Sequence, residues 1–232
     1  MIGPVIPEGG VAVLLARTGT ARPDQLDQPA LLDDAERGRR GELLRDPDRD
    51  RFTVGAVLLR TAVAAETGLP AGQVVVRRDC PGCARPHGRP VLPGTGLHAS
   101  VSHSGEVVAV ALTRLGPVGV DVEAHVPLDH AALHPLLLGP GELAGDLGEF
   151  YRTWTRKEAV LKATGDGLRV PMAELSVGPP GRPPRLLAYP GRPDLVVALA
   201  DLAIDDGYWA ALAVLGGPPT VVRLVQVGEP GR

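Results

Sequence analysis

Lysine, aromatic residues and cysteine are scarce in this chain, and each scarcity narrows what the protein can be. Of the 24 lysines and arginines, only Lys157 and Lys162 are lysines. Aromatic residues make up 3% of the 232 residues, too few to provide stacking platforms for nucleic-acid bases. Two cysteines cannot build a disulfide framework. The formal net charge of −3 gives no overall signature of nucleic-acid binding, so any phosphate must be bound by a local cluster.

Long hydrophobic runs are also missing. No stretch approaches the roughly 18 consecutive apolar residues that a membrane-spanning helix needs. The apolar run 11–16 has the length of a strand and lacks the basic flank of a targeting segment. We therefore expect a cytoplasmic protein that binds neither a membrane nor nucleic acid. Because 44% of the residues are hydrophobic, the chain can bury the core of one large domain or two small ones.

Hydrophobic periodicity predicts a mixed α/β chain. Helices are expected over 52–67, stopped by Gly68 and Pro70, and over 149–164, stopped by Gly165. The charged segment 33–50 is expected to form exposed helix and turn. Strands are expected at 11–16, 73–77, 99–104, 106–113, 118–123, 195–199, 208–215 and 221–227. A pattern of strand, Gly-Pro turn and strand occurs at 107–122 and again at 209–224, which suggests two similar α/β halves meeting near residue 118.

The segment 118–123 alternates cleanly between two kinds of residue. Its three valines face one side of the expected strand, and Gly119, Asp121 and Glu123 face the other. At about 3.4 Å per residue, the two acids lie ~7 Å apart at their Cα atoms. Carboxylate ligands of this kind suit a hard cation such as Mg²⁺. The alternative is an amphipathic edge strand with a solvated acidic face.

The helix expected over 149–164 carries both lysines. Phe150, Trp154 and Leu161 form its apolar stripe. Glu158 lies at the edge of that stripe, where a partly desolvated carboxylate needs a cation. Glu158 and Lys162 could simply be an i, i+4 ion pair that stabilises the helix by ~0.3–0.5 kcal/mol. That alternative leaves unexplained why these two positions are lysine when the other 22 basic positions are arginine.

Taken together, these segments resemble the signature of the phosphopantetheinyl transferase family. They are closest to its long, monomeric, surfactin-synthetase-activating subgroup. The matching segments, in order, are 88–92, 101–105, 119–123, 154–162 and 165–168. The resemblance covers about residues 51–175, and it departs from the family at 134–138, where a more aromatic helical stretch is expected.

The resemblance implies a fold and an activity. The fold is α/β (α+β), with two similar halves in a pseudo-twofold arrangement and coenzyme A and Mg²⁺ (or Mn²⁺) in the cleft between them. Residues 1–117 form the N-terminal half, and 118–232 form the C-terminal half with the metal site and the catalytic helix. The activity is that of a holo-[carrier protein] synthase, acting as a monomer. It moves the 4′-phosphopantetheine arm of coenzyme A to a serine of an apo acyl- or peptidyl-carrier protein and releases 3′,5′-ADP.

Residue roles are implied position by position. The metal ligands correspond to Asp121, Glu123 and Glu158. Glu158, or a metal-bound water beside it, corresponds to the base that takes the serine proton, and Lys162 and His103 complete the catalytic set. Two rival functions remain: a non-catalytic module that binds coenzyme A or a nucleotide, and a metal-dependent phosphoesterase of the same fold.

Coenzyme A contacts are implied at five positions. Ser102, His103 and Lys162 correspond to groups around the pyrophosphate, Arg89 to a basic residue beside the nucleotide, and Arg51 to a contact with the 3′-phosphate. Taken alone, His103 would be an ordinary packed side chain. The nearby arginines that could replace Arg51 at the 3′-phosphate are Arg45, Arg49 and Arg60.

Cys80 and Cys83, with His87 nearby, form a separate feature. A Cys-x-x-Cys spacing is half of a zinc site, and His87 could be a third ligand, with Asp79, His98 or water as the fourth. Free thiols in a tight turn are the favoured interpretation, with structural zinc and redox chemistry as alternatives. A bound metal would brace the loop rather than catalyse.

Overall fold

The fold consists of two compact units. A computed structural model describes residues 3–19, 28–80, 82–83, 85 and 87–228. One unit comprises Met1–Arg114 with Thr220–Arg232, and the other comprises Leu115–Pro219. The boundary expected between 117 and 118 thus lies close to the first change of unit. Each unit combines a sheet with helices, so the mixed α/β class is confirmed. Among the described residues, no helix is both long and apolar enough to cross a membrane.

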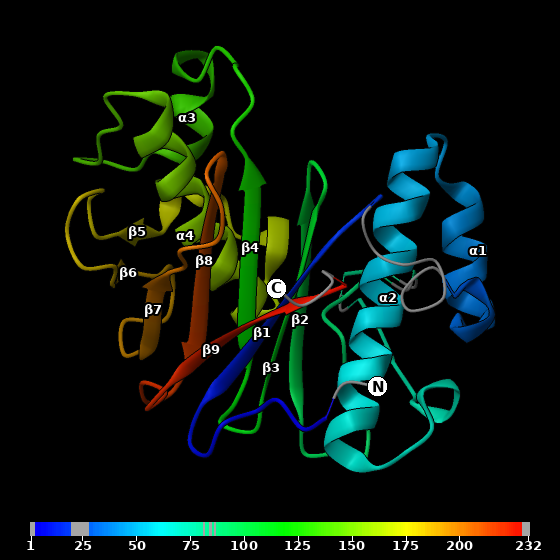
Figure 1. The fold of residues 1–232 in the computed structure, drawn as a ribbon. Coiled ribbons are helices and arrows are strands. Elements are labelled where there is room, and N and C mark those ends of the chain that lie inside the picture. The colour runs from blue at the N-terminus through cyan, green and yellow to red at the C-terminus, as the bar shows by residue number, and fades with distance from the viewer. Residues whose placement is uncertain (1–2, 20–27, 81, 84, 86, 229–232) are drawn as a thin grey trace. The chain divides into compact units, whose positions relative to one another are not determined.

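The first unit is built on a four-stranded sheet. The strands lie in the order β2 (His98–Ser104), β3 (Val107–Thr113), β1 (Val11–Arg17) and β9 (Val222–Val227). β9 runs parallel to β1, and the other neighbours are antiparallel. Figure 1 shows red β9 beside blue β1, although the two strands come from opposite ends of the sequence. This four-stranded sheet is therefore complete only once β9 has paired with β1.

The long helix α2 (Asp46–Thr67) packs on β3 and β2. Its buried side chains include Val57, Leu58 and Leu59, which meet the sheet in one hydrophobic core. The helix begins six residues before the expected start at 52. Pro47 in the first turn and the acidic residues near it suit a helix N-terminus.

A buried arginine joins α2 to the short helix α1 (Asp34–Glu42). The helix α1 begins with a capping box formed by Asp33 and Glu36. Arg60 of α2, 2% exposed, places its Nη2 atom 2.7 Å from a carboxylate oxygen of each of these two acids. The guanidinium donors of Arg60 are therefore already bonded within the protein, which makes Arg60 a poor candidate for a phosphate contact.

The prediction of a strand over 73–77 was wrong. A short 3₁₀ helix, Ala71–Gln73, occupies its start, and within this stretch only Arg77 pairs with another segment, through a β-bridge to Val91. Val74 is buried on its own as an anchor in the core of the first unit. A β-branched run therefore predicted a strand where the chain offers a single bridging position.

The second unit has one long helix against a three-stranded antiparallel sheet. The strands lie in the order β4 (Val118–Ala124), β8 (Tyr208–Leu215) and β7 (Val197–Asp201). Helix α4 (Leu147–Thr164) packs on β4 and β8, and begins at the N-cap Asp146. The other described elements of this unit are α3 (His134–Leu137), the small hairpin β5 (Ser176–Val177) and β6 (Leu186–Ala188), and short 3₁₀ turns at Ala131–Leu133, Gly167–Arg169 and Met172–Glu174. A further 3₁₀ turn, Pro29–Leu31, belongs to the first unit.

Gly119 lets α4 lie directly against β4. A Cβ atom built at this position would lie 1.9 Å from the carbonyl oxygen of Ala159 and 2.5 Å from the amide nitrogen of Ala163. Both are backbone atoms of α4, so a side chain at 119 cannot be accommodated by a rotamer change. The glycine therefore fixes the distance between the strand and the helix.

We predict that Gly119→Ala lowers the free energy of unfolding by about 3 kcal/mol or more, at or above the upper end of ordinary overpacking, because backbone atoms must move. Urea unfolding followed by circular dichroism measures this loss. The matched control is Gly217→Ala, where a Cβ atom meets nothing within 4 Å and the change should stay within about 0.5 kcal/mol. Equal stability of the two variants would contradict the close approach.

The exit of α4 is held by a buried tyrosine. The Tyr189 hydroxyl donates to Asp166 Oδ2 at 2.6 Å and lies 3.0 Å from Thr164 Oγ1. Burial and the neighbouring Asp166 raise the pKa of Tyr189 to about 12. Burial alone would raise the pKa of Asp166, but the hydrogen bonds from Tyr189 and Thr164, with nearby arginines, lower it overall.

This clamp predicts a loss of stability in alkali. The folded-state pKa of Tyr189 exceeds the ordinary value of 10.0, so its contribution is complete below pH 10 and is lost as the pH rises towards about 12. Tyr189→Phe should cost about 1.5–3 kcal/mol at neutral pH, since it removes a hydrogen bond to a charged group, and should show a shallower alkaline decline. Urea titrations across this range test both effects. A Tyr208→Phe control with the same shallow profile would refute the assignment to Tyr189.

Candidate functional site

Three carboxylates meet where β4 and α4 pack together. Asp121, 3% exposed, and Glu123 lie two residues apart on β4, on the same side as Gly119 and therefore towards α4. Glu158 projects from α4 and is half-buried. Burial raises the pKa of Glu158, Lys162 opposes that rise, and the charges of Asp121 and Glu123 add to it. The two elements thus bring together the three acids expected from the sequence.

Lys162 bridges the helix and the strand. Its Nζ atom lies 2.6 Å from Asp121 Oδ1, with the lysine side chain 29% exposed and the aspartate 4% exposed. The sequence suggested a pair with Glu158 along the helix. The structure shows that Lys162 pairs across to Asp121 while lying close enough to Glu158 to lower its pKa. The ammonium of Lys162 therefore interacts with Asp121 and Glu158 instead of forming only an ion pair along the helix surface.

The acid triplet is less tightly gathered than a metal-bound set. Within the described residues, the group whose possible ligand atoms all lie within 4.8 Å of one another is Cys80, Cys83 and His87. Asp121, one of the three acids, forms an ion pair with Lys162.

Lys157, the other lysine, is wholly buried and structural. Its Nζ atom donates to the carbonyl oxygens of Leu137 at 2.7 Å and Met172 at 3.0 Å, and to a carboxylate oxygen of Glu142. Three acceptors match the three donors of an ammonium, which explains why arginine does not stand here. Burial lowers the pKa of Lys157, and Glu142 offsets part of that effect.

Glu142 extends the same network, although sequence reasoning gave it no role. Its Oε1 atom accepts from the amide of Val177 at 2.9 Å, and its Oε2 atom accepts from the amide of Gly139 at 2.8 Å. The pair of Lys157 with Glu142 therefore ties α4 to β5 and to the loop after α3. An acidic residue between glycines in an unpatterned stretch was the only available signal.

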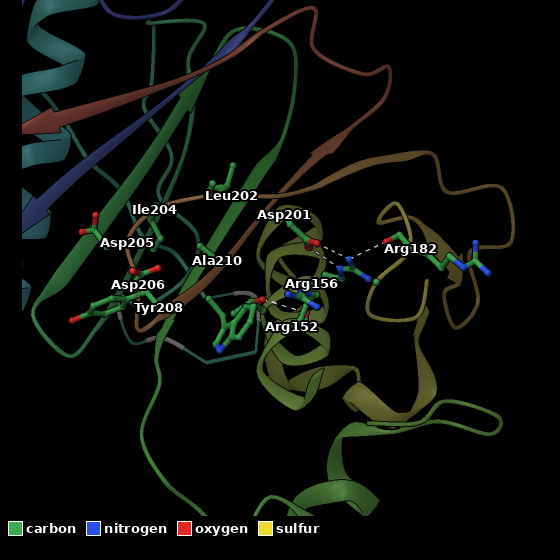
Figure 2. Close-up of a pocket in the computed structure, with 14 residues that line it drawn as sticks. Arg152, Arg156, Arg182, Asp201, Leu202, Ile204, Asp205, Asp206, Tyr208 and Ala210 are labelled. Atoms are coloured by element: carbon green, nitrogen blue, oxygen red, sulfur yellow. Dashed lines mark hydrogen bonds and ion pairs between the residues drawn. The ribbon is translucent and has the colours of Figure 1, made fainter. Parts of the chain in front are cut away.

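Arg156 is structural as well, although it lines a cavity of this unit. The cavity has a volume of about 530 Å³ and lies between α4 and the loop after β7. Figure 2 shows Arg156 pointing at Asp201 and at the backbone of Arg182. Asp201 accepts from Nε at 2.7 Å and from Nη2 at 2.6 Å, and the carbonyls of 178, 179 and 182 take the remaining donors. All five donors are satisfied, so none is left for a phosphate.

Trp209 is the neighbour of the acid pair that the sequence did not single out. It lies directly opposite Glu123 in the β4–β8 register, so the two side chains share one face of the sheet. The guanidinium of Arg152 from α4 lies 4.5 Å from the ring centroid of Trp209. Both residues line the cavity of Figure 2, which therefore borders the position of Glu123.

The first unit gathers the expected phosphate contacts around β2. Ser102 is buried at 6% exposure, and His103 is exposed on the same strand. Arg51 of α2 donates from Nη1 to the carbonyl oxygen of Gly105 at 2.7 Å and pairs with Asp48. The structure therefore places Arg51 at the turn that follows the segment 101–104. Among its proposed alternatives, Arg49 is engaged by Asp46 and by the carbonyl of residue 43.

Arg89 lies on the loop that leads into β2. Burial lowers the pKa of His98, the first residue of β2, and the charge of Arg89 lowers it further. Arg77 and Val91 exchange two backbone hydrogen bonds of 2.9 and 2.8 Å. Arg89 thus stands two residues before a paired position, close to the beginning of the strand that carries Ser102.

The cysteine group closes the tip of the same loop. Cys80 and Cys83 form no disulfide bond, and Cys83 Sγ lies 2.9 Å from His87 Nε2. Hydrogen bonds from the backbone of Arg85 and from His87 lower the pKa of Cys83 to about 6. Pro81, Ala84 and Pro86 lie outside the described residues.

Comparison with known proteins provides independent evidence for the family. The profile of the 4′-phosphopantetheinyl transferase superfamily matches residues 117–213, the segment that holds β4, α4 and most of β8. The 4′-phosphopantetheinyl transferase HetI of Nostoc is 31% identical over 213 residues, covering 82% of this chain and 85% of that protein. A putative 4′-phosphopantetheinyl transferase of Synechocystis is 29% identical, covering 84% of this chain and 83% of its own length.

A third relative supports the subgroup. The 4′-phosphopantetheinyl transferase Sfp of Bacillus subtilis is 29% identical, over 56% of this chain and 58% of that protein. The relatives match across both units, and the superfamily profile falls on the strand and helix that carry the acid triplet. The chain belongs to the 4′-phosphopantetheinyl transferase superfamily and is a transferase.

Proposed function

We propose that this enzyme transfers the 4′-phosphopantetheine arm of coenzyme A to a serine of an apo acyl- or peptidyl-carrier protein and releases 3′,5′-ADP. The observation that carries the proposal is the convergence of Asp121, Glu123 and Glu158 with Lys162 at the contact between β4 and α4. In the reaction, the serine oxygen forms a bond to the β-phosphorus of coenzyme A. The bond from that phosphorus to the oxygen bridging to 3′,5′-ADP breaks, and the serine proton leaves.

The acid triplet suits a divalent cation. Its donors are all carboxylate oxygens, the ligands that Mg²⁺ prefers. The raised pKa of Glu158, caused by burial and by the two neighbouring acids, is the electrostatic cost of gathering these groups without enough positive charge. We assign Asp121, Glu123 and Glu158 as the residues that would hold Mg²⁺, which when bound neutralises charge on the phosphates.

Glu158 and Lys162 act on the reacting groups. A carboxylate with a raised pKa is a better proton acceptor, so Glu158 is suited to take the proton of the attacking serine. Lys162, held by Asp121, is suited to stabilise negative charge that develops on the phosphoryl oxygens. Each role uses a property that the packing of α4 on β4 creates.

The first unit is proposed to bind the rest of coenzyme A. Ser102 and His103 on β2 suit the pyrophosphate, together with Lys162. Arg51, held at the turn after that strand, suits the 3′-phosphate. Arg89 suits the region beside the nucleotide. Because Arg60 is buried in an ion-pair network, it is withdrawn from the phosphate contacts.

Transfer to a carrier protein is tested by intact-mass spectrometry. Wild-type enzyme incubated with coenzyme A, Mg²⁺ and several apo carrier proteins should add the mass of one phosphopantetheine arm to a carrier. Glu158→Gln should slow this by about 10²–10⁴-fold, the usual contribution of a positioned base. The variant should fold at least as stably as wild type, because it removes a half-buried charge that two other acids repel.

The matched control is Glu174→Gln, an exposed position of the same unit, which should keep wild-type turnover. After desalting, Mg²⁺ or Mn²⁺ should restore activity better than Ca²⁺, because the smaller ions suit a tight octahedral site. Phosphopantetheine released into solution would indicate a phosphoesterase instead. Coenzyme A binding without any product would indicate a non-catalytic binding module. Near-wild-type turnover of Glu158→Gln at saturating Mg²⁺ would show that the base and metal assignment is wrong.

Lys162→Arg discriminates between a catalytic and a structural lysine. Arginine pairs with a carboxylate at least as well as lysine, so the contact with Asp121 and the fold should persist. A guanidinium is wider and planar, and it should crowd the cation or the pyrophosphate. We expect kcat/KM to fall by an amount equivalent to about 2–4 kcal/mol, the scale of one preorganised electrostatic contact.

Steady-state transfer to an apo carrier protein, together with thermal melting, measures both properties of this variant. The matched control exchanges the same two residue types in the opposite direction, as Arg169→Lys at a half-exposed ion pair just after α4. That variant should keep both activity and Tm. Unchanged turnover in Lys162→Arg would return Lys162 to a purely structural role.

A further inference from the structure

The loop between Arg77 and Val91 brings three metal-ligating side chains to one point. The ligand atoms of Cys80, Cys83 and His87 all lie within 4.8 Å of one another. Two sulfurs bound at about 2.3 Å to a tetrahedral zinc ion lie roughly 3.8 Å apart, so only a small adjustment is needed. This group belongs to the first unit, whereas the acid triplet belongs to the second, and the group has no place in the proposed chemistry.

Both sulfurs accept backbone hydrogen bonds in the same way. The amide of Gly82 donates to Cys80 Sγ at 3.4 Å, and the amide of Arg85 donates to Cys83 Sγ. Each donor stands two residues after the cysteine that it contacts. Amide groups that donate to ligand sulfurs orient them, as outer-shell contacts do in metal sites. Both cysteines therefore receive a backbone contact from the residue two positions later.

A fourth coordination position can be reached from solvent. Cys83 and His87 are exposed, and His87 lines a cavity of about 380 Å³ between this loop and α1. Asp79, the acidic neighbour of the cysteines, is engaged with Arg77. The available donors are therefore two sulfurs, one imidazole nitrogen and one water molecule, a soft and borderline set that selects Zn²⁺ over Mg²⁺.

We propose that Cys80, Cys83 and His87 bind a structural zinc ion, with water in the fourth position, and that this ion fixes the loop that presents Arg89. The loop is already paired at its base, through Gly88 to Arg78 at 2.9 Å and through the bridge of Arg77 with Val91. A zinc ion at His87 adds a further anchor two residues before Arg89, beyond the Gly88 contact one residue before it and the Val91 bridge two residues after it. The free thiols favoured from the sequence alone are replaced by a zinc site in this proposal.

Metal content tests the site without reference to activity. The full-length protein is purified under reducing conditions without a histidine tag, and metals are quantified by mass spectrometry before and after incubation with Zn²⁺ alone. Wild type should retain close to one zinc ion per chain. Cys80→Ser, Cys83→Ser and His87→Ala should each weaken zinc binding by more than the roughly 10–100-fold that loss of an outer-shell contact gives. His130→Gln, a histidine of the second unit, should bind zinc like wild type.

Cobalt gives a second signature. The Co²⁺-loaded wild type should show thiolate-to-cobalt charge-transfer absorption, which weakens in each single-cysteine variant and disappears in the double variant. Protein that takes up no Zn²⁺ and shows no such band, with two alkylatable thiols or a disulfide between the cysteines, would overturn the proposal. A histidine-independent zinc content would overturn the assignment of His87.

The role of the ion in holding Arg89 rests on the proposed function and is measured separately. Cys80→Ser with Cys83→Ser should keep kcat within about twofold while KM for coenzyme A rises about threefold or more, the mark of lost ground-state binding. In the background of Arg89→Ala, the same cysteine changes should add nothing further to KM. Additive effects would show that the ion does not act through Arg89. Failure of transfer itself would leave the metal content unaffected, so the two proposals fail independently.

Discussion

The contact between Gly119 and the backbone of α4 is the constraint on which the acid site depends. A single missing Cβ atom lets the helix come close enough for Glu158 and Lys162 to reach the face of β4 that carries Asp121 and Glu123. Asp121 and Glu123 lie two and four residues beyond the glycine on the same face of β4. Moving α4 outward would therefore take Glu158 and Lys162 away from both of these acids. The alternation along β4 places Asp121 and Glu123 on one face, and the close packing of α4 on that face brings Glu158 to them.

The two lysines show how residue identity follows from the shape of the acceptors. Lys157 is enclosed by two carbonyls and a carboxylate, an arrangement that fits three tetrahedral donors. Arg156, one residue earlier, donates all five N–H groups of its planar guanidinium to one carboxylate and three carbonyls. Lys162 remains partly exposed beside the acids. One helix therefore carries two buried cations that hold the fold and one that faces the proposed chemistry.

Much of this could be predicted from the sequence because it follows from local periodicity. The alternation over 118–123 placed the acids on one face, and the helical stripe placed Glu158 at the edge of the buried surface. The partner of Lys162 could not be predicted in this way, because a pairing along the helix and a pairing across to β4 satisfy the same pattern. The burial of Arg60 also escaped prediction, since its two acidic partners lie 27 and 24 residues away. The same limit applies to 73–77, where the residue types favour a strand but, among the described residues, only the bridge of Arg77 with Val91 forms.

The pairing of β9 with β1 imposes an order on biosynthesis. The first unit needs residues 222–227 as the parallel neighbour of residues 11–16, whereas the second unit is contained within 115–219. During translation the second unit has all of its strands before the first has its last one. Until then, β1 presents one unpaired backbone edge. Residues 11–16 therefore keep one open backbone edge during translation until residues 222–227 have been made, a state in which such an edge can pair with the wrong strand.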